Sequence, residues 1–486
     1  MNNRDHSTSS IVVCGGGLAG LSAGVTALEN GASVTLFEKA PNPGGSAALS
    51  GGALWGFSDF DRIRNLVPDG DAVLQWQVHE EINAARDWLE AQGAKLTPLQ
   101  EYPHLGRIDR HMDPPQAIES LTKKFQQLGG QLFPEHAMES LMTSANGTVC
   151  GVRVVNNGHI KEIRAPAVIL ATGGFQGNAE LLSRYIVRNP GNVTLRANPW
   201  STGDGFLAAT AIGGAASAGL HTFYGHCMVA PPARVTPDDF RDVTQWYSQR
   251  SIAVNLYGQR FTDETAGTTD QNVNQSLAHQ PRGLGFLIID EVMMQSPAVD
   301  GRPLQTKAII DRSRKIGAVI LQDDSIAGLC RQLATHYGLP EKALFKEIEH
   351  FNRCIEAGEA GELVPPRSRL RSALLKAPFY AIPVKASITF TMGGLQVDER
   401  ARVLRRAGGS SSHAPVPPSR GMVEAETLTL RIDGEYRHTA IEGLYAAGTD
   451  VGNICNWNYI GGLGPSLVFG RIAGRNAAAF ANQMTR

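Results

Sequence analysis

Three glycines and a later acid are the first residues of the chain whose types and spacing could do chemistry. Gly15, Gly17 and Gly20 form a GxGxxG pattern, and Glu38 follows them. Glycines at these positions allow a tight turn, a close approach of the backbone to a pyrophosphate, and close packing of a helix against a sheet. The carboxylate of the later acid can accept hydrogen bonds from a ribose diol. The pattern therefore predicts a dinucleotide site.

The segments around these glycines have the order that such a site requires. Residues 11–14 are an apolar run typical of a buried parallel strand, and residues 18–30 carry apolar side chains at helical spacing until Gly31. Residues 32–37 form a second predicted strand, which leads into Glu38. The positive end of the intervening helix would then face the negative charge of the pyrophosphate. A tight turn without a ligand is the alternative interpretation.

Several further blocks of sequence resemble one superfamily of flavoproteins. This superfamily holds succinate dehydrogenase, fumarate reductase, tricarballylate dehydrogenase and the 3-ketosteroid dehydrogenases. Residues 38–55 are similar to its EK…GG(S/T)…SGG segment, in which the first glycine pair passes the phosphates and the second lies beside the isoalloxazine ring. The other similar blocks are an ATGG strand at 168–175, a TGDG turn at 202–205, a TxGG(L/V)xVD turn at 391–398, a GLYAAG block at 443–448 and a GxxFGRIAG block at 459–474.

This resemblance spans nearly the whole chain and implies its fold. The expected fold class is α/β with an α+β cap, in which a Rossmann-like FAD-binding domain carries an inserted capping domain. The first part of the FAD-binding domain is expected at 1–217, the capping or substrate domain at 218–378, and the second part of the FAD-binding domain at 379–486. The turn-rich stretch at 405–420 is predicted to be a mobile surface insertion.

Local signals outside the motifs predict further helices and strands. Asp71 and Asp113 are expected to cap the N-termini of helices that end near Gly93 and Gly129. A helix is also expected after the TGDG turn. The remaining predicted elements are strands at 131–133, 148–155 and 159–164 and cap helices between residues 323 and 357.

The resemblance implies a non-covalent FAD site. A helix that begins near Ser466 is expected to direct its positive end at the pyrimidine edge of the flavin, with the backbone N–H groups of Ser466 and Leu467 as donors. Residues 46–49 contain no histidine, whereas the covalent members of the superfamily carry one there. The predicted cofactor-binding residues are Gly15, Gly17, Leu18, Ala19, Gly20, Glu38, Lys39, Gly44, Gly45, Ser46, Ser50, Gly51, Gly52, Ala171, Thr172, Gly173, Asp204, Gly448, Asp450, Ser466 and Leu467.

The substrate side departs from the fumarate reductases, which the chain resembles at residues 258–264. Those enzymes continue with TTRD, whose arginine delivers the proton, whereas this chain reads TTDQ at 268–271. They also carry a histidine before TMGG, where this chain has ITFT at 388–391, and an arginine in NRLGG, where this chain has NYIGG at 458–462. Three positions that handle carboxylates or protons thus lack their basic residue. Burial of two substrate carboxylates without fixed cations would be unfavourable.

Three residues are candidates for catalysis. Tyr459 resembles a tyrosine of the ketosteroid dehydrogenases that lies close to the flavin and acts on the substrate ketone, so it could polarise a carbonyl or remove an α proton. His226 and Tyr224 are expected where the cap meets the flavin, and the histidine could bind a carbonyl oxygen or move a proton. The alternatives are a packing role for Tyr459 and a structural role for His226. Arg260 lies in a turn that members with different substrates share, and we expect it to be structural.

Composition limits the classes of partner. The formal net charge is −1 and the charges form no basic stripe, so a nucleic acid is not expected as a partner. The six cysteines are scattered without a CxxC pair, so no metal site is predicted. The N-terminal residues lack an apolar signal segment, and no apolar run approaches a membrane span. We therefore expect a cytoplasmic protein that exchanges electrons with an external acceptor or donor.

These observations together predict an FAD-dependent oxidoreductase that acts on CH–CH donors. Its small-molecule substrate is expected to be a largely neutral ketone, cyclic ketones included, which it desaturates or, as an ene-reductase, reduces next to the carbonyl. One alternative is a dehydrogenase or reductase of a small di- or tricarboxylate, with Lys385 or a cap arginine as the cation. The other alternative is an electron-transfer flavoprotein without a C–C substrate of its own.

Overall fold

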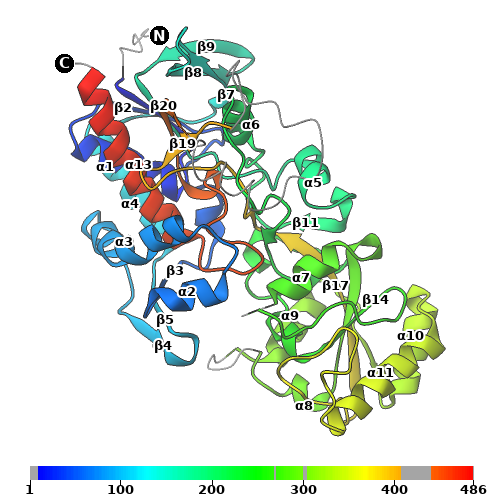
Figure 1. Cartoon of the computed structure of the whole chain (residues 1–486). Coiled ribbons are helices and arrows are strands. Elements are labelled where there is room, and N and C mark those ends of the chain that lie inside the picture. Colours follow the sequence, from blue (N-terminus) through cyan, green and yellow to red (C-terminus); the bar gives the residue numbers. More distant parts are fainter. Residues whose placement is uncertain (1–8, 268–269, 299–303, 407–438, 485–486) are drawn as a thin grey trace, which may run out of the picture.

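The computed structural model of the protein describes residues 9–267, 270–298, 304–406 and 439–484. Within these ranges the chain forms two lobes, which Figure 1 shows at the upper left and the lower right. Both ends of the chain lie with the first lobe, and the second is built from the middle of the sequence. Most of the predicted insertion at 405–420 falls outside the described residues.

A six-stranded sheet forms the centre of the first lobe. Its strand order is β19 (Arg402–Leu404), β20 (Ala440–Ala446), β10 (Ala167–Leu170), β1 (Ile11–Cys14), β2 (Val34–Phe37) and β6 (Gln131–Phe133). Every neighbouring pair is parallel except β19 with β20. All residues of β1, β2 and β10 are buried, as expected for parallel strands that are covered on both faces. The predicted Rossmann-like fold is confirmed.

Two helices lie against this sheet and against each other. Figure 1 shows α1 (Leu18–Glu29) beside α13 (Leu463–Met484), although the two helices come from opposite ends of the chain. A Cβ atom at Gly470 would lie 2.5 Å from the Ala19 carbonyl oxygen, and one at Gly474 would lie 2.4 Å from the Ala23 carbonyl oxygen. Glycine is therefore needed at both positions for the two helices to come this close.

Two amphipathic helices begin where the sequence predicts them. The carboxylate of Asp71 accepts the backbone N–H groups of Val73 and Leu74 and caps α3 (Ala72–Ala91), which packs on α13. The carboxylate of Asp113 caps α4 (Pro114–Gln127), which packs on α1. In the described part of the chain no helix has the length and apolar character that crossing a membrane requires.

Short elements complete the first lobe and lead to the second. Two three-stranded sheets have the orders β3-β5-β4 and β7-β8-β9, and β8 and β9 match the strands predicted after residue 148. The elements are β3 (Ala53–Phe57), α2 (Phe60–Leu66), β4 (Gln100–Tyr102), β5 (Arg107–His111), β7 (Ala137–Thr143), β8 (Val149–Asn156), β9 (His159–Arg164), α5 (Ala179–Tyr185) and α6 (Asp204–Ala211).

A second sheet forms the centre of the cap. Its strands are β11 (Val193–Leu195), β13 (Met228–Val229), β14 (Ile252–Asn255), β15 (Leu284–Ile289), β16 (Leu321–Asp323) and β17 (Phe379–Ile388). Strand β17 pairs with β11, β13, β15 and β16. Both β11 and β17 lie outside the predicted cap range of 218–378, so the cap sheet extends beyond those boundaries. A strand pattern does not show which sheet a strand will join.

The cap helices surround this sheet, and a two-stranded ribbon leads back to the first lobe. Strand β12 (Phe223–Tyr224) pairs antiparallel with β18 (Phe390–Thr391), which follows β17 directly. The cap helices are α7 (Gln271–Ala278), α8 (Glu291–Met294), α9 (Thr306–Lys315), α10 (Ile326–Tyr337) and α11 (Glu341–Glu356), and the last two match the helices predicted between residues 323 and 357.

Arg260 lies in the interior of the cap. Its guanidinium donates to both carboxylate oxygens of Glu264, at 2.9 and 2.6 Å, and to the Pro365 carbonyl oxygen at 2.6 Å. Arg367 donates to the same carboxylate at 3.2 Å, and all three charged side chains are fully buried. This arrangement supports the structural role that the sequence predicts for Arg260.

Replacing Gly474 by valine is expected to destabilise the first lobe. The new side chain would overlap the Ala23 carbonyl oxygen, so α1 and α13 would have to move apart. Overpacking of this kind costs about 1–3 kcal/mol, which urea unfolding of the holoprotein can measure. Gly361→Val is the matched control, because a Cβ at Gly361 meets nothing within 4 Å. Equal unfolding midpoints for the two variants would contradict the close contact between α1 and α13.

Candidate active site

A cavity of about 1180 Å³ lies between the first sheet and the cap. It is reached from the carboxyl ends of β1, β2, β10 and β20, where ligands bind in open α/β sheets. Gly20, Gly44, Asp450 and Leu467 are not among its described lining residues. The predicted cofactor residues that do line it are Gly15, Gly17, Leu18, Ala19, Glu38, Lys39, Gly45, Ser46, Ser50, Gly51, Gly52, Ala171, Thr172, Gly173, Asp204, Gly448 and Ser466.

The N-terminus of α1 faces this cavity without a side-chain cap. Gly17 is the N-cap residue, and a Cβ there would meet only the Gly44 carbonyl oxygen, at 3.9 Å. Gly15 has a φ of +109° and packs on Ala171. A Cβ atom at Gly15 would lie 2.1 Å from the Ala171 carbonyl oxygen. A Cβ at Gly20 would lie 1.8 Å from the Gly15 carbonyl oxygen. Open space in front of uncapped amides fits a pyrophosphate.

Glu38 is fixed at the end of β2 by two backbone bonds. One carboxylate oxygen accepts the Gly16 N–H and the other accepts the Ala40 N–H, each at 2.6 Å. Burial raises the pKa of this carboxyl, and the backbone donors oppose the shift. A carboxylate oxygen has two lone pairs, so each oxygen can still accept a hydroxyl. This geometry fits the ribose contact that the sequence predicts.

Lys39 and Asp204 form an ion pair rather than two separate ligand contacts. The Lys39 ammonium lies 3.0 Å from the Asp204 carboxylate and donates to the Thr202 hydroxyl at 2.6 Å. The pair connects the end of β2 to the start of α6 at the cavity wall. Both residues remain predicted contacts of the cofactor, but each already has a partner within the chain.

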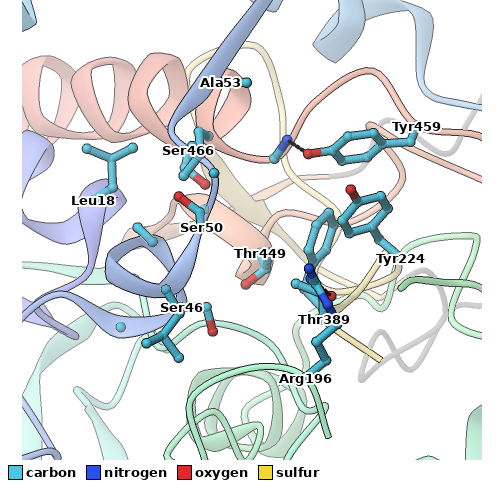
Figure 2. Close-up of a pocket in the computed structure, with 18 of the residues that line it drawn as sticks. Leu18, Ser46, Ser50, Ala53, Arg196, Tyr224, Thr389, Thr449, Tyr459 and Ser466 are labelled. Carbon is cyan, nitrogen blue, oxygen red and sulfur yellow. Dashed lines mark hydrogen bonds between the residues drawn. The ribbon is translucent and has the colours of Figure 1, made fainter. Parts of the chain in front are cut away.

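Asp450 lies behind the cavity wall, and Thr449 takes the lining position. The Asp450 carboxylate accepts the Thr172 hydroxyl at 3.0 Å and also accepts the Thr172 backbone N–H. Burial raises the pKa of Asp450 to about 6, and these donors oppose the shift. Thr449 lines the cavity, where Figure 2 shows its side chain. The GLYAAG block places this turn correctly, but it does not show which residue of the turn points inward.

Helix α13 begins earlier than the sequence predicts. Its first residue is Leu463, and the Ser466 N–H donates to the Gly462 carbonyl oxygen at 3.1 Å. Leu467 is fully buried and is not among the described lining residues. The prediction that Ser466 and Leu467 provide backbone donors is therefore corrected: the first-turn amides belong to Leu463 and Gly464. The predicted start is too late because the sequence indicates Pro465 as the first residue of the helix, whereas it lies within the first turn.

Two of the predicted catalytic residues belong to one hydrogen-bonded chain. The Tyr224 hydroxyl lies 2.8 Å from Nε2 of His226, and Nδ1 of His226 lies 2.7 Å from a carboxylate oxygen of Asp270. The other Asp270 oxygen accepts the Cys227 backbone N–H at 3.1 Å. His226 and Asp270 are buried, and burial lowers the pKa of His226 although Asp270 opposes the shift. The sequence did not predict the part played by Asp270.

Tyr459 stacks on Tyr224 at the edge of the cavity. The two rings have centroids 3.9 Å apart and planes inclined by 16°, and both residues line the cavity. The Tyr459 oxygen accepts the Gly462 backbone N–H at 2.9 Å, which Figure 2 shows as a dashed line. Burial raises the pKa of Tyr459 well above its usual range. The structure therefore brings the three predicted catalytic residues, Tyr459, Tyr224 and His226, to one place.

Arg196 is a cation of the cavity that the sequence motifs did not reveal. It donates to the Thr389 hydroxyl at 3.2 Å, the Phe240 carbonyl at 3.1 Å and the Thr244 hydroxyl at 3.3 Å. Burial lowers the pKa of its guanidinium. Figure 2 shows Arg196 on the same side of the view as Thr389, Tyr224 and Tyr459. It follows β11 in a loop without a motif, so only the fold places it here.

Four more arginines line the cavity, but Lys385 does not. Lys385, the cation named for a carboxylate substrate, donates to the Gly191 carbonyl oxygen at 2.7 Å and is not among the described lining residues. Within the described ranges no group of three or more histidine, cysteine or acidic residues could hold a metal ion. The lining arginines besides Arg196 are Arg107, Arg241, Arg250 and Arg369.

Comparisons with known proteins agree with the geometry. A family model described as "FAD binding domain" matches residues 10–412. The chain is 26% identical to a probable fumarate reductase of Shewanella frigidimarina, over 98% of this chain and 75% of that protein. It is 27% identical to a urocanate reductase of Eggerthella lenta, over 97% of this chain and 75% of that protein.

Two solved structures share the fold. A flavocytochrome c3 fumarate reductase in an open conformation superposes with a TM-score of 0.69 at 24% identity, covering 98% of this chain and 78% of that chain. A 3-ketosteroid delta1-dehydrogenase from Sterolibacterium denitrificans has a TM-score of 0.71 at 20% identity, covering 97% and 99%. At these identities the two structures show a common fold.

Replacing Gly17 by aspartate is expected to separate folding from cofactor binding. Aspartate is a good N-cap residue, so the apoprotein should unfold at the same urea concentration or slightly higher. Its carboxylate would occupy the open space before the α1 amides and repel a pyrophosphate, so FAD affinity should fall about 100-fold or more. Fluorescence titration of apoprotein with FAD measures this. Unchanged FAD affinity would contradict the phosphate site at α1.

Proposed function

This chain belongs to the FAD binding domain family and is an FAD-dependent oxidoreductase acting on CH–CH bonds, and we propose that the bond it desaturates or reduces lies next to a carbonyl group of a small molecule. The hydrogen-bonded chain Tyr224–His226–Asp270, which ends at the cavity, is the observation that carries the proposal. Such chemistry needs a group that moves the α proton as well as a hydride carrier.

The proposed FAD site uses the residues that fit it. The α1 amides would hold the pyrophosphate, and Glu38 would hold the ribose. Bound FAD would supply hydride exchange at the β carbon. We infer non-covalent binding, because residues 46–49 contain no histidine, and we retain an external electron acceptor or donor and a cytoplasmic location as proposals. Neither a nucleic acid nor a metal has a part in the proposed reaction.

Asp270 would fix which ring nitrogen of His226 carries the hydrogen. A carboxylate only accepts hydrogen bonds, so Nδ1 of His226 carries the ring hydrogen and Nε2 accepts from the Tyr224 hydroxyl. In desaturation, Nε2 would take the Tyr224 proton while the Tyr224 oxygen takes the substrate α proton. In reduction, both proton transfers would run in reverse. Asp270 would stabilise the imidazolium, which desaturation forms and reduction consumes.

We propose that Tyr459 acts on the substrate carbonyl. Its oxygen already accepts the Gly462 N–H, so its own proton is the group that it can offer to a carbonyl oxygen. The stacked Tyr224 would then lie beside the same substrate. Polarising the carbonyl makes the α proton more acidic, so the two tyrosines would have complementary roles.

An electron-transfer flavoprotein without its own C–C substrate is the competing function. Such a protein has no need of a proton-transferring chain at its cavity. Mixing anaerobic, dithionite-reduced holoenzyme with unsaturated ketones and carboxylates distinguishes the two. Rapid reoxidation of the flavin supports the proposal, whereas reaction with protein or dye acceptors only supports the competing function.

Replacing Asp270 by asparagine is expected to slow proton transfer without loss of FAD. Asparagine has one acceptor oxygen, so its amide must face either Nδ1 of His226 or the Cys227 N–H, and the ring tautomer is no longer enforced. Flavin reduction by a saturated substrate should slow about 10²- to 10⁴-fold. Asp263→Asn, which alters another cap carboxylate outside the described cavity lining, is the matched control. Equal rates in both variants would contradict the proposed roles.

The pH dependence of the two directions should be opposite. Burial lowers the pKa of His226 below its usual value of 6.5, so the imidazole is neutral at pH 7 and can accept a proton. Desaturation should lose rate as the pH falls through that lowered pKa, and reduction should lose rate as the pH rises through it. Stopped-flow flavin absorbance between pH 4.5 and 8 measures both. If the His226→Gln variant still shows either pH-dependent loss of rate, that loss is caused by the titration of another group.

A further inference from the structure

Arg196 is a cavity cation that hydrogen-bonds only to neutral groups of the described chain. Its partners among the described residues are two hydroxyls and one backbone carbonyl, all of them neutral. Its Nε–H is buried and has no hydrogen-bond partner within the described ranges. The Asp270 charge acts on this guanidinium from a distance, but no described carboxylate contacts it, so an anionic ligand in direct contact would stabilise it.

The other lining arginines have different surroundings. The Arg107 guanidinium lies 3.0 Å from the Asp109 carboxylate and 3.9 Å from the centre of the Trp55 ring. Arg250 donates to the Pro297 carbonyl, and Arg369 donates to backbone carbonyls of the cap. Arg241 is exposed, so water screens its charge. Among the lining arginines, Arg196 is therefore the one that combines a buried Nε–H without an acceptor and hydrogen-bond partners that are all neutral, within the described ranges.

The position of Arg196 relates it to the proton-transferring residues. It donates to Thr389, which lies next to Phe390, and the Phe390 ring contacts both Tyr224 and Tyr459. Figure 2 shows Arg196 and Thr389 below Tyr224, on the side of the cavity opposite Leu18 and Ser46. A carboxylate held by Arg196 would place the adjacent carbon atoms near the Tyr224 hydroxyl.

We propose that Arg196 binds the carboxylate of a monoanionic substrate, an α,β-unsaturated monocarboxylic acid or its saturated partner. This inference rests on the function proposed above and names its substrate class. Arg196 would donate a charge-assisted hydrogen bond to the carboxylate through the second N–H of Nη1, because Thr389 accepts only one of the two. Aromatic rings line much of the rest of this region: Tyr224, Phe390, Tyr459, Trp55 and Trp246. Of the cations near them, Arg107 is paired with Asp109, and Arg241 is exposed to water. A dicarboxylate would thus place its second charge beside aromatic rings and guanidiniums that are already paired or exposed, and a neutral ketone would leave Arg196 without a contacting anion.

The test compares acids with their uncharged amides. Dithionite-reduced holoenzyme is mixed anaerobically with crotonate, cinnamate, crotonamide, cinnamamide and fumarate, and flavin reoxidation is followed. Each acid and its amide have nearly the same shape but differ in charge, so the ratio of their kcat/KM values reports a cation. Binding of 3-phenylpropionate to oxidised holoenzyme is measured separately, through its perturbation of the flavin spectrum.

Arg196→Gln is expected to reduce the acid-to-amide ratio by about 10- to 100-fold, chiefly by raising KM for the acid. It should also abolish the spectral response to 3-phenylpropionate while FAD remains bound. Arg241→Gln, which removes an exposed cation of the same cavity, is the matched control and should change the ratio less than about threefold. Arg196→Lys keeps the charge and should retain part of the preference for the acid.

Several outcomes would overturn the proposal. These are preference for the amides in the wild type, preference for fumarate over both monoacids, an unchanged ratio in Arg196→Gln, or no spectral response to 3-phenylpropionate. If Arg196→Gln does not fold or does not bind FAD, the acid-to-amide ratios of kcat/KM in Arg196→Lys and in the wild type test the proposal instead. Reoxidation by none of the compounds would contradict the proposed function itself, whereas reoxidation by amides alone would contradict only the role of Arg196.

Discussion

The close approach of backbone segments at the carboxyl edge of the first sheet is the constraint on which the rest of the structure depends. No side chain fits between Gly15 and the Ala171 carbonyl, or between Gly20 and the Gly15 carbonyl. The first turn of α1 is therefore drawn onto β1 and β10, and its uncapped amides face the cavity. A helix terminus without internal partners needs water or a ligand, so this packing creates an anion site as it creates the fold.

The cap contributes the other half of the site through one long segment. Strand β17 runs through the middle of the cap sheet, and the chain then continues directly into β18 and the first lobe. Because β18 pairs with β12, Tyr224 lies opposite Phe390 and next to Tyr459. The pairing that leads the cap back to the first lobe thus also brings Tyr224 beside Tyr459.

The charged side chains of the cap and of the cavity differ in their partners. Arg260 and Arg367 share the carboxylate of Glu264, so their charges are compensated inside the cap. Asp270 receives one N–H from His226 and one from the backbone, which orients the imidazole. Arg196 differs, because the oxygens around it are neutral. A low local dielectric strengthens each of these interactions, and under our proposal a substrate carboxylate would give Arg196 the contacting anion that the described chain does not supply.

The sequence by itself determined the features that depend on local geometry. The glycine pattern between two apolar strands predicted the α1 turn, and Asp71 and Asp113 predicted helix starts, because each acts on the backbone within a few residues. Only the tertiary structure decided which strands join the cap sheet, that Thr449 rather than Asp450 faces the cavity, and that Asp270 and Arg196 stand beside the tyrosines. The physical reason is that these contacts join residues far apart in the chain, so the spacing of residues within a short segment cannot predict them.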